Sequence, residues 1–230
     1  IEIPPKFAGR PPVNPDSRRK AGMQAWKGAQ GLAEDVRYYG QWMRDEAFKR
    51  IGHLYPKVKV TKEMAKERPD LKQYVGKDLT IIAYRWARTV NSPNPALAKI
   101  EVPLASTFLL ATKAGTEARV EPVVDGSTYR FAVKMGLPDD LVAARNGTKL
   151  AGANFRCVVS QVPISGDYIK EEGQAGRIGA RMMAIVAEGT TGKVYLAPSA
   201  EHEARAREAS PAWRPEGAVP ARLTGGTCVP

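Results

Sequence analysis

The chain has 230 residues, of which 43% are hydrophobic and 26% charged, and its formal net charge is +11. This length can bury a core in one large domain or two small ones, and the composition is typical of a globular protein. No apolar stretch approaches the ~20 residues of a membrane-spanning helix. The opening IEIPPKFAGRPP lacks the apolar centre of a signal peptide. These features predict a cytoplasmic protein without a membrane partner.

The positive charge is the strongest compositional feature. It favours nucleic acid or another anionic surface, because Lys and Arg neutralise phosphates and release counterions. The alternative is a charge that serves solubility or reflects a basic proteome. The two histidines and two cysteines are scattered at His53, Cys157, His202 and Cys228. They lack the close pairs of a disulfide framework or a zinc site, so we interpret them as four unrelated residues in a reducing compartment.

Residues 1–77 form the first predicted region, which is helical. Residues 1–16 contain five prolines and predict an extended lead-in. From Ser17 the pattern turns helical, and between Trp26 and Ile51 apolar residues recur at three-, four- or six-residue steps, which predicts a long amphipathic helix. Gly52 and Pro56 are its stop signals, and a short helix follows at residues 62–68.

From Leu79 onward the pattern becomes strand-like. The predicted strands are residues 79–90, 106–112, 118–124, 128–135, 154–163, 181–187 and 193–196. Asp125-Gly126 is a hairpin turn, and Ser199 caps a last helix, residues 199–209. Strands and helices do not alternate as in a parallel sheet, so we predict an α+β fold. Its regions are helical residues 1–77, a mainly antiparallel β region at 78–198, and a C-terminal helix and extended tail at 199–230.

The familiar enzyme motifs are absent from the sequence. No strand leads into a GxGxxG, and GxxxxGK[ST], HExxH, EF-hand and nucleophile-elbow patterns do not occur. Two acidic pairs, Asp139-Asp140 and Glu171-Glu172, lie in polar contexts, where solvated loop acids or helix-start acids are the better interpretation. The sequence therefore predicts no self-sufficient active site.

One stretch carries a pattern that suits nucleic acid. Tyr84-Arg85-Trp86-Ala87-Arg88 alternates aromatic with basic residues, and such a strand could stack bases on rings and hold phosphates with arginines. The alternative is a half-buried strand whose aromatics lie in the core. Lysines at positions 57, 59, 62 and 66 add a basic stripe with the same ambiguity. The candidate nucleic-acid-binding residues are Arg85, Arg88, Lys57 and Lys59.

Three stretches together resemble the large adenine-specific DNA methylases that carry a zinc-ribbon insert. They are IEIPPKF, the run GLAEDVRYYGQWM with the following RIGHLYP, and IIAYRWARTVNSPNPALAKIEVPL. The later ANFRCVVSQVPI, GRIGARMMAIVAEG and KVYLAPSAEHEARA follow in the order of the same insert. The resemblance covers nearly the whole chain. It implies that the chain lies between the two catalytic blocks of a larger methyltransferase, whose remainder would be its partner.

In that family a Cys-Pro-Asn-Pro turn and a later Cys-x-x-Cys hold one zinc ion in tetrahedral thiolate geometry. Here the corresponding positions are Ser92, Ala96 or Leu97, Cys157 and Ser160. One thiol remains, and a hydroxyl is a poor zinc ligand beside a thiolate. We therefore expect a degenerate zinc ribbon without metal, held together by packing and hydrogen bonds.

The resemblance also implies where the chemistry resides. The block that contacts S-adenosylmethionine and the Asn/Asp-Pro-Pro-Tyr block that holds the target base do not occur in this sequence, so we expect no catalytic residue and no cofactor in this chain. The leading expectation is a non-catalytic insert of a restriction-modification type methyltransferase that contacts DNA or positions its target. The alternatives are a structural or protein-interaction module without DNA binding, and a self-contained enzyme whose site the sequence hides.

Overall fold

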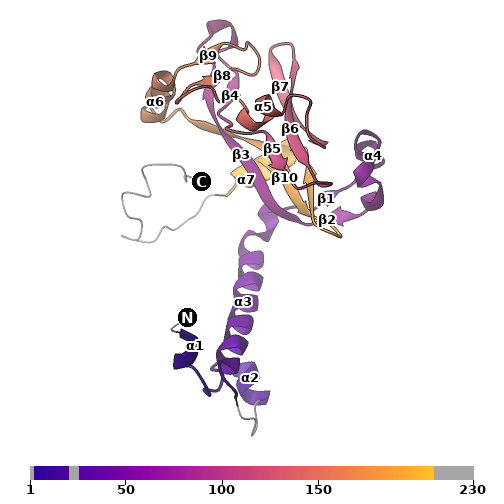
Figure 1. Cartoon of the computed structure of the whole chain (residues 1–230), viewed down its shortest axis with the longest axis vertical. Helices are drawn as coiled ribbons and strands as arrows, with labels where there is room; N and C mark the ends of the chain where they lie inside the picture. The colour runs from indigo at the N-terminus through magenta and orange to yellow at the C-terminus, as the bar shows by residue number, and fades with distance from the viewer. Residues whose placement is uncertain (1–2, 21–25, 210–230) are drawn as a thin grey trace. The chain divides into compact units, whose positions relative to one another are not determined.

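The computed structural model describes residues 3–20 and 26–209, and it has the predicted α+β class (Figure 1). The chain divides into two compact units between Leu54 and Tyr55. This division lies earlier than the expected limit at residue 77. Residues 55–77 belong with the sheets because Val60 and Leu71 are buried in the core of the second unit.

The first unit contains three helices, listed here with their bounds: α1 (Ile3–Lys6), α2 (Pro15–Lys20) and α3 (Gln30–Ile51). The predicted long helix is interrupted between α2 and α3, where Gly28 has a left-handed φ of 51°. α3 ends at Ile51 as predicted, and Gly52 at its C-cap donates its N–H to the carbonyl of Phe48. The 3-10 helix η1 (Gly52–Leu54) closes the unit.

Asp35 fastens the proline-rich lead-in to α3. Its carboxylate accepts the backbone N–H of Val13 at 3.0 Å and that of Asn14 at 2.8 Å, together with the Asn14 amide at 2.9 Å. Asn14 is fully buried. The lead-in also lies so close to Gly31 that a Cβ there would collide with the carbonyl oxygen of Arg10. A glycine at this position therefore permits the close approach.

The second unit is built from antiparallel strands. A four-stranded sheet has the order β11-β10-β3-β4, with β3 (Ile81–Asn91), β4 (Glu101–Pro103), β10 (Gly179–Glu188) and β11 (Lys193–Leu196). A three-stranded sheet consists of β5 (Leu109–Ala111), β6 (Ala118–Asp125) and β7 (Thr128–Met135). Two ribbons pair β1 (Val58–Lys59) with β2 (Asp78–Leu79), and β8 (Phe155–Arg156) with β9 (Pro163–Ile164).

The helices of the second unit start at side-chain caps. Thr61, Asp140, Ser165 and Ser199 each accept the N–H three residues on, which satisfies a free donor of the first turn. They open α4 (Lys62–Glu67), α5 (Leu141–Asn146), α6 (Gly166–Gln174) and α7 (Ala200–Arg207), and two 3-10 helices are η2 (Pro69–Tyr74) and η3 (Pro95–Leu97).

Most predicted elements are present. Besides the interrupted helix, the expectation of an extended lead-in at residues 1–16 is wrong within the described residues, because Ile3–Lys6 form α1 and α2 begins at Pro15. The strand expected at residues 154–163 is wrong, because a tight turn at Cys157–Val162 separates β8 from β9. The helices α5 and α6 were not predicted. Within residues 3–20 and 26–209, no helix is long and apolar enough to cross a membrane.

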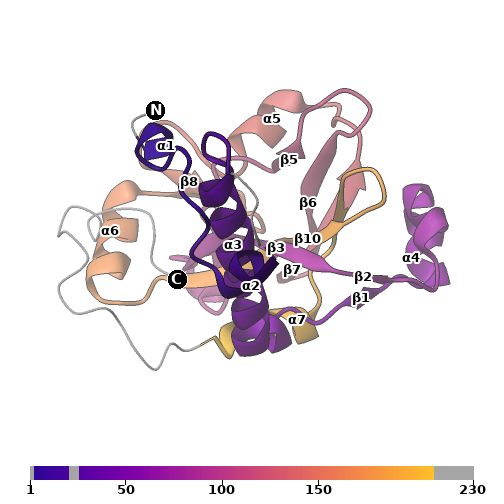
Figure 2. The ribbon, with the colours of Figure 1, turned by 90° about the horizontal axis from the view of Figure 1, so that it is seen from below.

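The four-stranded sheet has a core on each face. One core cluster joins β3, β4 and β10 to β6 and β7, and the other joins β3, β10 and β11 to the β1–β2 ribbon and η2. Figure 2 shows α5 and β6 on one side of β3 and β10, and α7 on the other. Ala184 and Ile185, neighbours in a regularly paired part of β10, enter different clusters. This is the alternation that a strand buried on both faces requires.

Candidate nucleic-acid interface

Arg85 and Arg88 do not share a surface. Both side chains are exposed, but they lie an odd number of residues apart in a regular part of β3, so they project from opposite faces of the sheet. Arg88 projects on the same face as Tyr84 and Trp86. The two predicted arginines therefore cannot bind one phosphate backbone together through a single face.

The face that carries Arg88 holds a second arginine that the sequence pattern did not reveal. Arg207 of α7 lies with its guanidinium carbon 5.7 Å from the ring centroid of Trp86. It also donates to the carbonyl of Ala180, the residue opposite Arg88 in β10, and pairs with Glu203 at 2.8 Å. α7 thus brings a distant cation beside Trp86 and Arg88.

Tyr84 and Trp86 on this face are half-buried, whereas Tyr55 is exposed. Tyr84 stacks on Tyr55, with ring centroids 5.2 Å apart and planes 7° apart. Burial, followed by the neighbouring Tyr55, raises the pKa of Tyr84 to about 12. Tyr84 and Trp86 also pack against the second core cluster, as the alternative interpretation of this strand expected. We call the whole set, Tyr55, Tyr84, Trp86, Arg88 and Arg207, the aromatic–arginine strip.

Lys59 lies in β1 of the β1–β2 ribbon, and Lys57 directly precedes this strand. Both are exposed, and they alternate with the buried Val58 and Val60, so they share the outer side of the ribbon. Lys59 lies opposite Asp78 in the register of the ribbon. Figure 1 places this ribbon near the start of β3. The lysine pair is therefore a separate basic feature, close in sequence to Tyr55 of the aromatic–arginine strip.

Several other arginines are occupied by the fold itself. Arg68 pairs with Asp70 at 2.7 Å and donates to the carbonyls of Val133 and Tyr195 at 3.1 Å. Arg181 lies 4.3 Å from the ring centroid of Tyr129 and donates to the carbonyl of the same residue. These cations stabilise packing between elements. Fewer positive charges are therefore available to a ligand than the net charge suggests.

Three of the positions that the resemblance assigns to zinc ligands lie together: Ser92, Cys157 and Ser160. The thiol of Cys157 accepts the backbone N–H of Ser160 at 3.5 Å, and the hydroxyls of Ser160 and Ser92 also hydrogen-bond to it. Burial alone would raise the pKa of this thiol, but these hydrogen bonds and one from the N–H of Val159 outweigh it and lower the pKa below its ordinary value. Hydroxyl and amide donors therefore surround the remaining sulfur.

The backbone around this cluster forms two tight turns. In the first, Ser92 accepts the N–H of Asn94, and Pro95 opens η3. Leu97 of that turn is half-buried and packs against the first core cluster, whereas Ala96 is exposed. Leu97 is thus the position that faces inward. In the second turn Gln161, directly after Ser160, adopts a left-handed φ of 60°.

The acidic pairs have structural roles. Asp140 is a helix-start acid as predicted, because it caps α5 by accepting the N–H of Ala143 at 2.8 Å. The expectation of solvated acids is wrong for Glu172, which is buried and pairs with Arg177 at 2.7 Å. Hydrogen bonds from Arg177 lower the pKa of Glu172.

The two histidines lie in different units. His53 is exposed in η1, and His202 is buried in α7 with its Nδ1 2.6 Å from the Ser199 hydroxyl. Cys228 lies outside the described residues. Across residues 3–20 and 26–209, no group of three or more His, Cys, Asp and Glu side chains is placed to hold a metal ion. No family model, curated protein or solved structure matches this chain.

Proposed function

We propose that this chain is a non-catalytic insert of a DNA adenine methyltransferase, and that its role is to contact DNA. The observation that carries the DNA contact is the aromatic–arginine strip, where Arg88 and Arg207 lie on one face of the sheet beside Trp86. The methyltransferase context rests on the sequence resemblance. The reaction itself, and its S-adenosylmethionine, would belong to the remainder of the larger chain.

The mechanism is electrostatic. Arg88 would bind a phosphate of one DNA strand through two parallel hydrogen bonds from its guanidinium. Arg207, whose Nη2 is bonded to Ala180 and Glu203, would contribute its remaining N–H groups and its charge to the same strand. Trp86 fixes the guanidinium of Arg207 in place, which reduces the entropy lost on binding. Lys57 and Lys59 would extend the contact along the backbone. Arg85, on the other face, is not part of this interface.

The test is a fluorescence anisotropy titration of the chain with duplex DNA at low and moderate salt. We expect binding to weaken steeply with salt, because each phosphate contact releases a counterion. The double substitution Arg88→Gln, Arg207→Gln should make the slope of log K against log salt less steep by about 2, since each neutralised phosphate contributes ~0.9 to its magnitude.

Arg145→Gln is the matched control, because Arg145 is an exposed arginine on α5, outside the strip. It should leave the salt slope within about 0.5 of the original. Absence of binding, or binding that is independent of salt, would refute the proposed DNA contact.

A second candidate function is a module that braces the two parts of a methyltransferase. It is favoured by the exposed apolar side chains of α3. On this helix Val36 and Met43 are each 64% exposed and Trp42 is 58% exposed. Together with Tyr39 they lie within two turns on one side of the helix. Exposed apolar groups gathered in this way are typical of protein-interaction surfaces.

The bracing function would require α3 to bind the remainder of the methyltransferase. Met43→Glu should abolish co-sedimentation of the chain with the separately purified catalytic blocks, because a carboxylate cannot be buried unpaired. Phe48→Glu is the control, since Phe48 is 74% exposed on the other side of α3. Equal effects of both substitutions, or no association with the blocks, would exclude this role.

A further inference from the structure

We propose that the second unit contains a nucleotide-binding pocket that is separate from the aromatic–arginine strip. A cavity of about 440 Å³ opens between β6, the start of α5 and the turn after β8. Its size lies within the range of ~300–1,000 Å³ that is common for small-molecule sites. It borders the first core cluster, whereas Tyr84 and Trp86 of the strip pack on the second.

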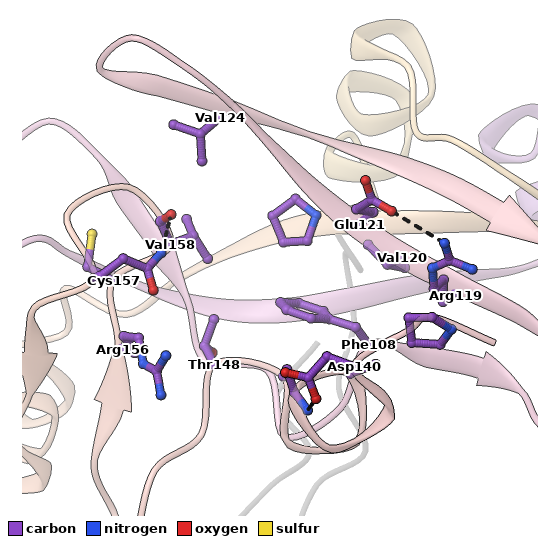
Figure 3. A pocket seen from close by; sticks show the side chains of 16 residues that line it. Phe108, Arg119, Val120, Glu121, Val124, Asp140, Thr148, Arg156, Cys157 and Val158 are labelled. Carbon is purple, nitrogen blue, oxygen red and sulfur yellow. Dashed lines mark hydrogen bonds and ion pairs between the residues drawn. The ribbon is translucent and has the colours of Figure 1, made fainter. Parts of the chain in front are cut away.

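The pocket has an apolar interior with one aromatic ring. Phe108 lies in the middle of the view in Figure 3, and Val120, Pro122, Pro138 and Val158 supply further apolar surface. The flat ring of Phe108 can accept the face of another ring by stacking and dispersion. The interior therefore suits a planar group such as a nucleobase.

Most polar groups at the rim are occupied. Arg119 pairs with Glu121 and donates to the carbonyls of Met135 and Gly136, and Glu121 also pairs with Lys134 at 2.7 Å. The Thr148 hydroxyl donates to the carbonyls of Pro103 and Ala105. These groups shape the pocket without offering a ligand an open partner.

Two charged groups of the lining remain available among the residues that the structure describes. Within residues 3–20 and 26–209, the Arg156 guanidinium has no hydrogen bond or ion pair, and the side chain is exposed. Asp140 uses Oδ1 to cap α5, and in the same described ranges Oδ2 has no partner. Figure 3 shows Arg156 on the β8 side and Asp140 at the start of α5. The pocket thus offers an anion partner, an apolar slot and an acceptor.

A nucleotide with an amino-bearing base matches this arrangement. The base would lie against Phe108, its exocyclic amine would donate to Asp140, and its phosphate would pair with Arg156. Adenine and cytosine have such an amine. The same chemistry is present in a free mononucleotide and in an unpaired nucleotide of a nucleic-acid strand. The inference does not depend on binding to duplex DNA.

The experiment is an isothermal titration of the full chain with AMP, adenosine, IMP and inorganic phosphate. AMP should bind at least about tenfold more tightly than inorganic phosphate or IMP, since IMP places a carbonyl oxygen against Asp140. Arg156→Gln should weaken the binding of AMP about tenfold and leave the binding of adenosine unchanged. Ala143 lines the pocket at an exposed position of α5. Ala143→Leu should fill part of the pocket and weaken the binding of AMP and of adenosine at least about tenfold.

Asp140→Asn tests the proposed contact between the exocyclic amine and Asp140 most directly. Asn remains a good helix cap, so α5 should persist, while its amide can donate to the carbonyl of IMP and reverse the preference. Arg145→Gln on the same helix is the control and should bind AMP like the unmodified chain. No AMP binding at millimolar concentration, equal binding of phosphate, or indifference to Ala143→Leu with an unchanged melting temperature would each overturn the proposal.

Competition distinguishes the two sources of the nucleotide. A single-stranded oligonucleotide that displaces AMP, when the matching duplex does not, would assign the site to an unpaired nucleotide. AMP binding without such displacement would assign it to free nucleotide. Duplex binding that depends on Arg88 and Arg207 is a separate measurement, so failure of either proposal is distinguishable from failure of the other.

Discussion

Cys157 shows how a buried thiol is surrounded by hydrogen-bond donors from distant parts of the chain. The thiol is almost fully buried, at 1% exposure, and its neighbours are the hydroxyls of Ser92 and Ser160. Ser92 comes from the turn after β3, and Ser160 from the turn after β8. Two turns that are distant in sequence therefore meet at one sulfur, which hydrogen bonds stabilise.

This convergence predicts that thiols can restore a metal site. A Ser92→Cys, Leu97→Cys, Ser160→Cys variant, with the native Cys157, should bind one zinc ion, because the two turns would then supply four thiolates, two from each turn. The measurement is zinc content after gel filtration, together with the thiolate absorbance of the cadmium form.

The matched control carries Ala96→Cys in place of Leu97→Cys. Ala96 is exposed whereas Leu97 is half-buried against the core, so the control should retain less zinc. Equal zinc in both variants, or none in the first, would show that the four positions do not meet as described.

At the scale of elements, α3 depends on a contact that lies outside the helix. Local periodicity predicts the helix, but Gly31 is its only buried residue among those described. Asp35 ties the lead-in to it through Val13 and Asn14. Burial alone would raise the pKa of Asp35, yet the hydrogen bonds from Val13 and Asn14 outweigh it and lower the pKa.

Because the pKa of Asp35 is lowered in the folded chain, the contribution of Asp35 to stability must fall at acid pH. A carboxyl whose pKa is lower in the folded state stabilises the fold above its unfolded value, about 3.9. That stabilisation is lost as the pH falls through the lower, folded value. Hydrogen exchange at Val13 and Asn14 should therefore be slow from neutral pH down to about 4 and should lose protection below it.

Asp35→Ala should remove the same protection at neutral pH. It would leave the buried Asn14 amide without its acceptor, at a cost of about 1–3 kcal/mol. Asp45→Ala, at an acid of α3 that bonds only to Gln41 among the described residues, is the control. If both variants exchange at the original rate, Asp35 does not hold the lead-in.

For the whole molecule, the two units differ in how they are stabilised. Both core clusters consist of residues after Leu54. The first unit, by contrast, exposes large apolar residues along α3, including Tyr39 and Ile51. A domain's stability comes mainly from its buried apolar surface. The buried apolar surface that stabilises a fold therefore lies in the second unit.

Residues 55–230 should accordingly fold without the first unit. We expect a cooperative thermal transition, followed by circular dichroism, within about 5 °C of that of the full chain. Residues 1–54 alone should melt without cooperativity, because isolated helices are marginal in water. A non-cooperative transition of residues 55–230 would show that the first unit contributes to the core.

The sequence by itself determined the local elements. Periodicity and end signals are properties of neighbouring residues, which is why the end of α3 at Ile51, β7 at Thr128–Met135 and β11 at Lys193–Leu196 could be predicted. α6 was missed because the glycines from Gly173 onward indicated a flexible connection. In the structure Ser165 caps a helix that includes Gly173 and ends at Gln174.

Only the tertiary structure decided which side chains share a site. Arg207 reaches Trp86 because α7 packs on the sheet, and Ser92 reaches Cys157 because two turns meet. Arg85 and Arg88, close in sequence, are separated by the alternation of β3. Strand alternation was visible in the sequence, but the packing of α7 depends on long-range burial. Neighbouring residues do not encode that contact, so the strip and the pocket at Asp140 and Arg156 emerge only from the fold.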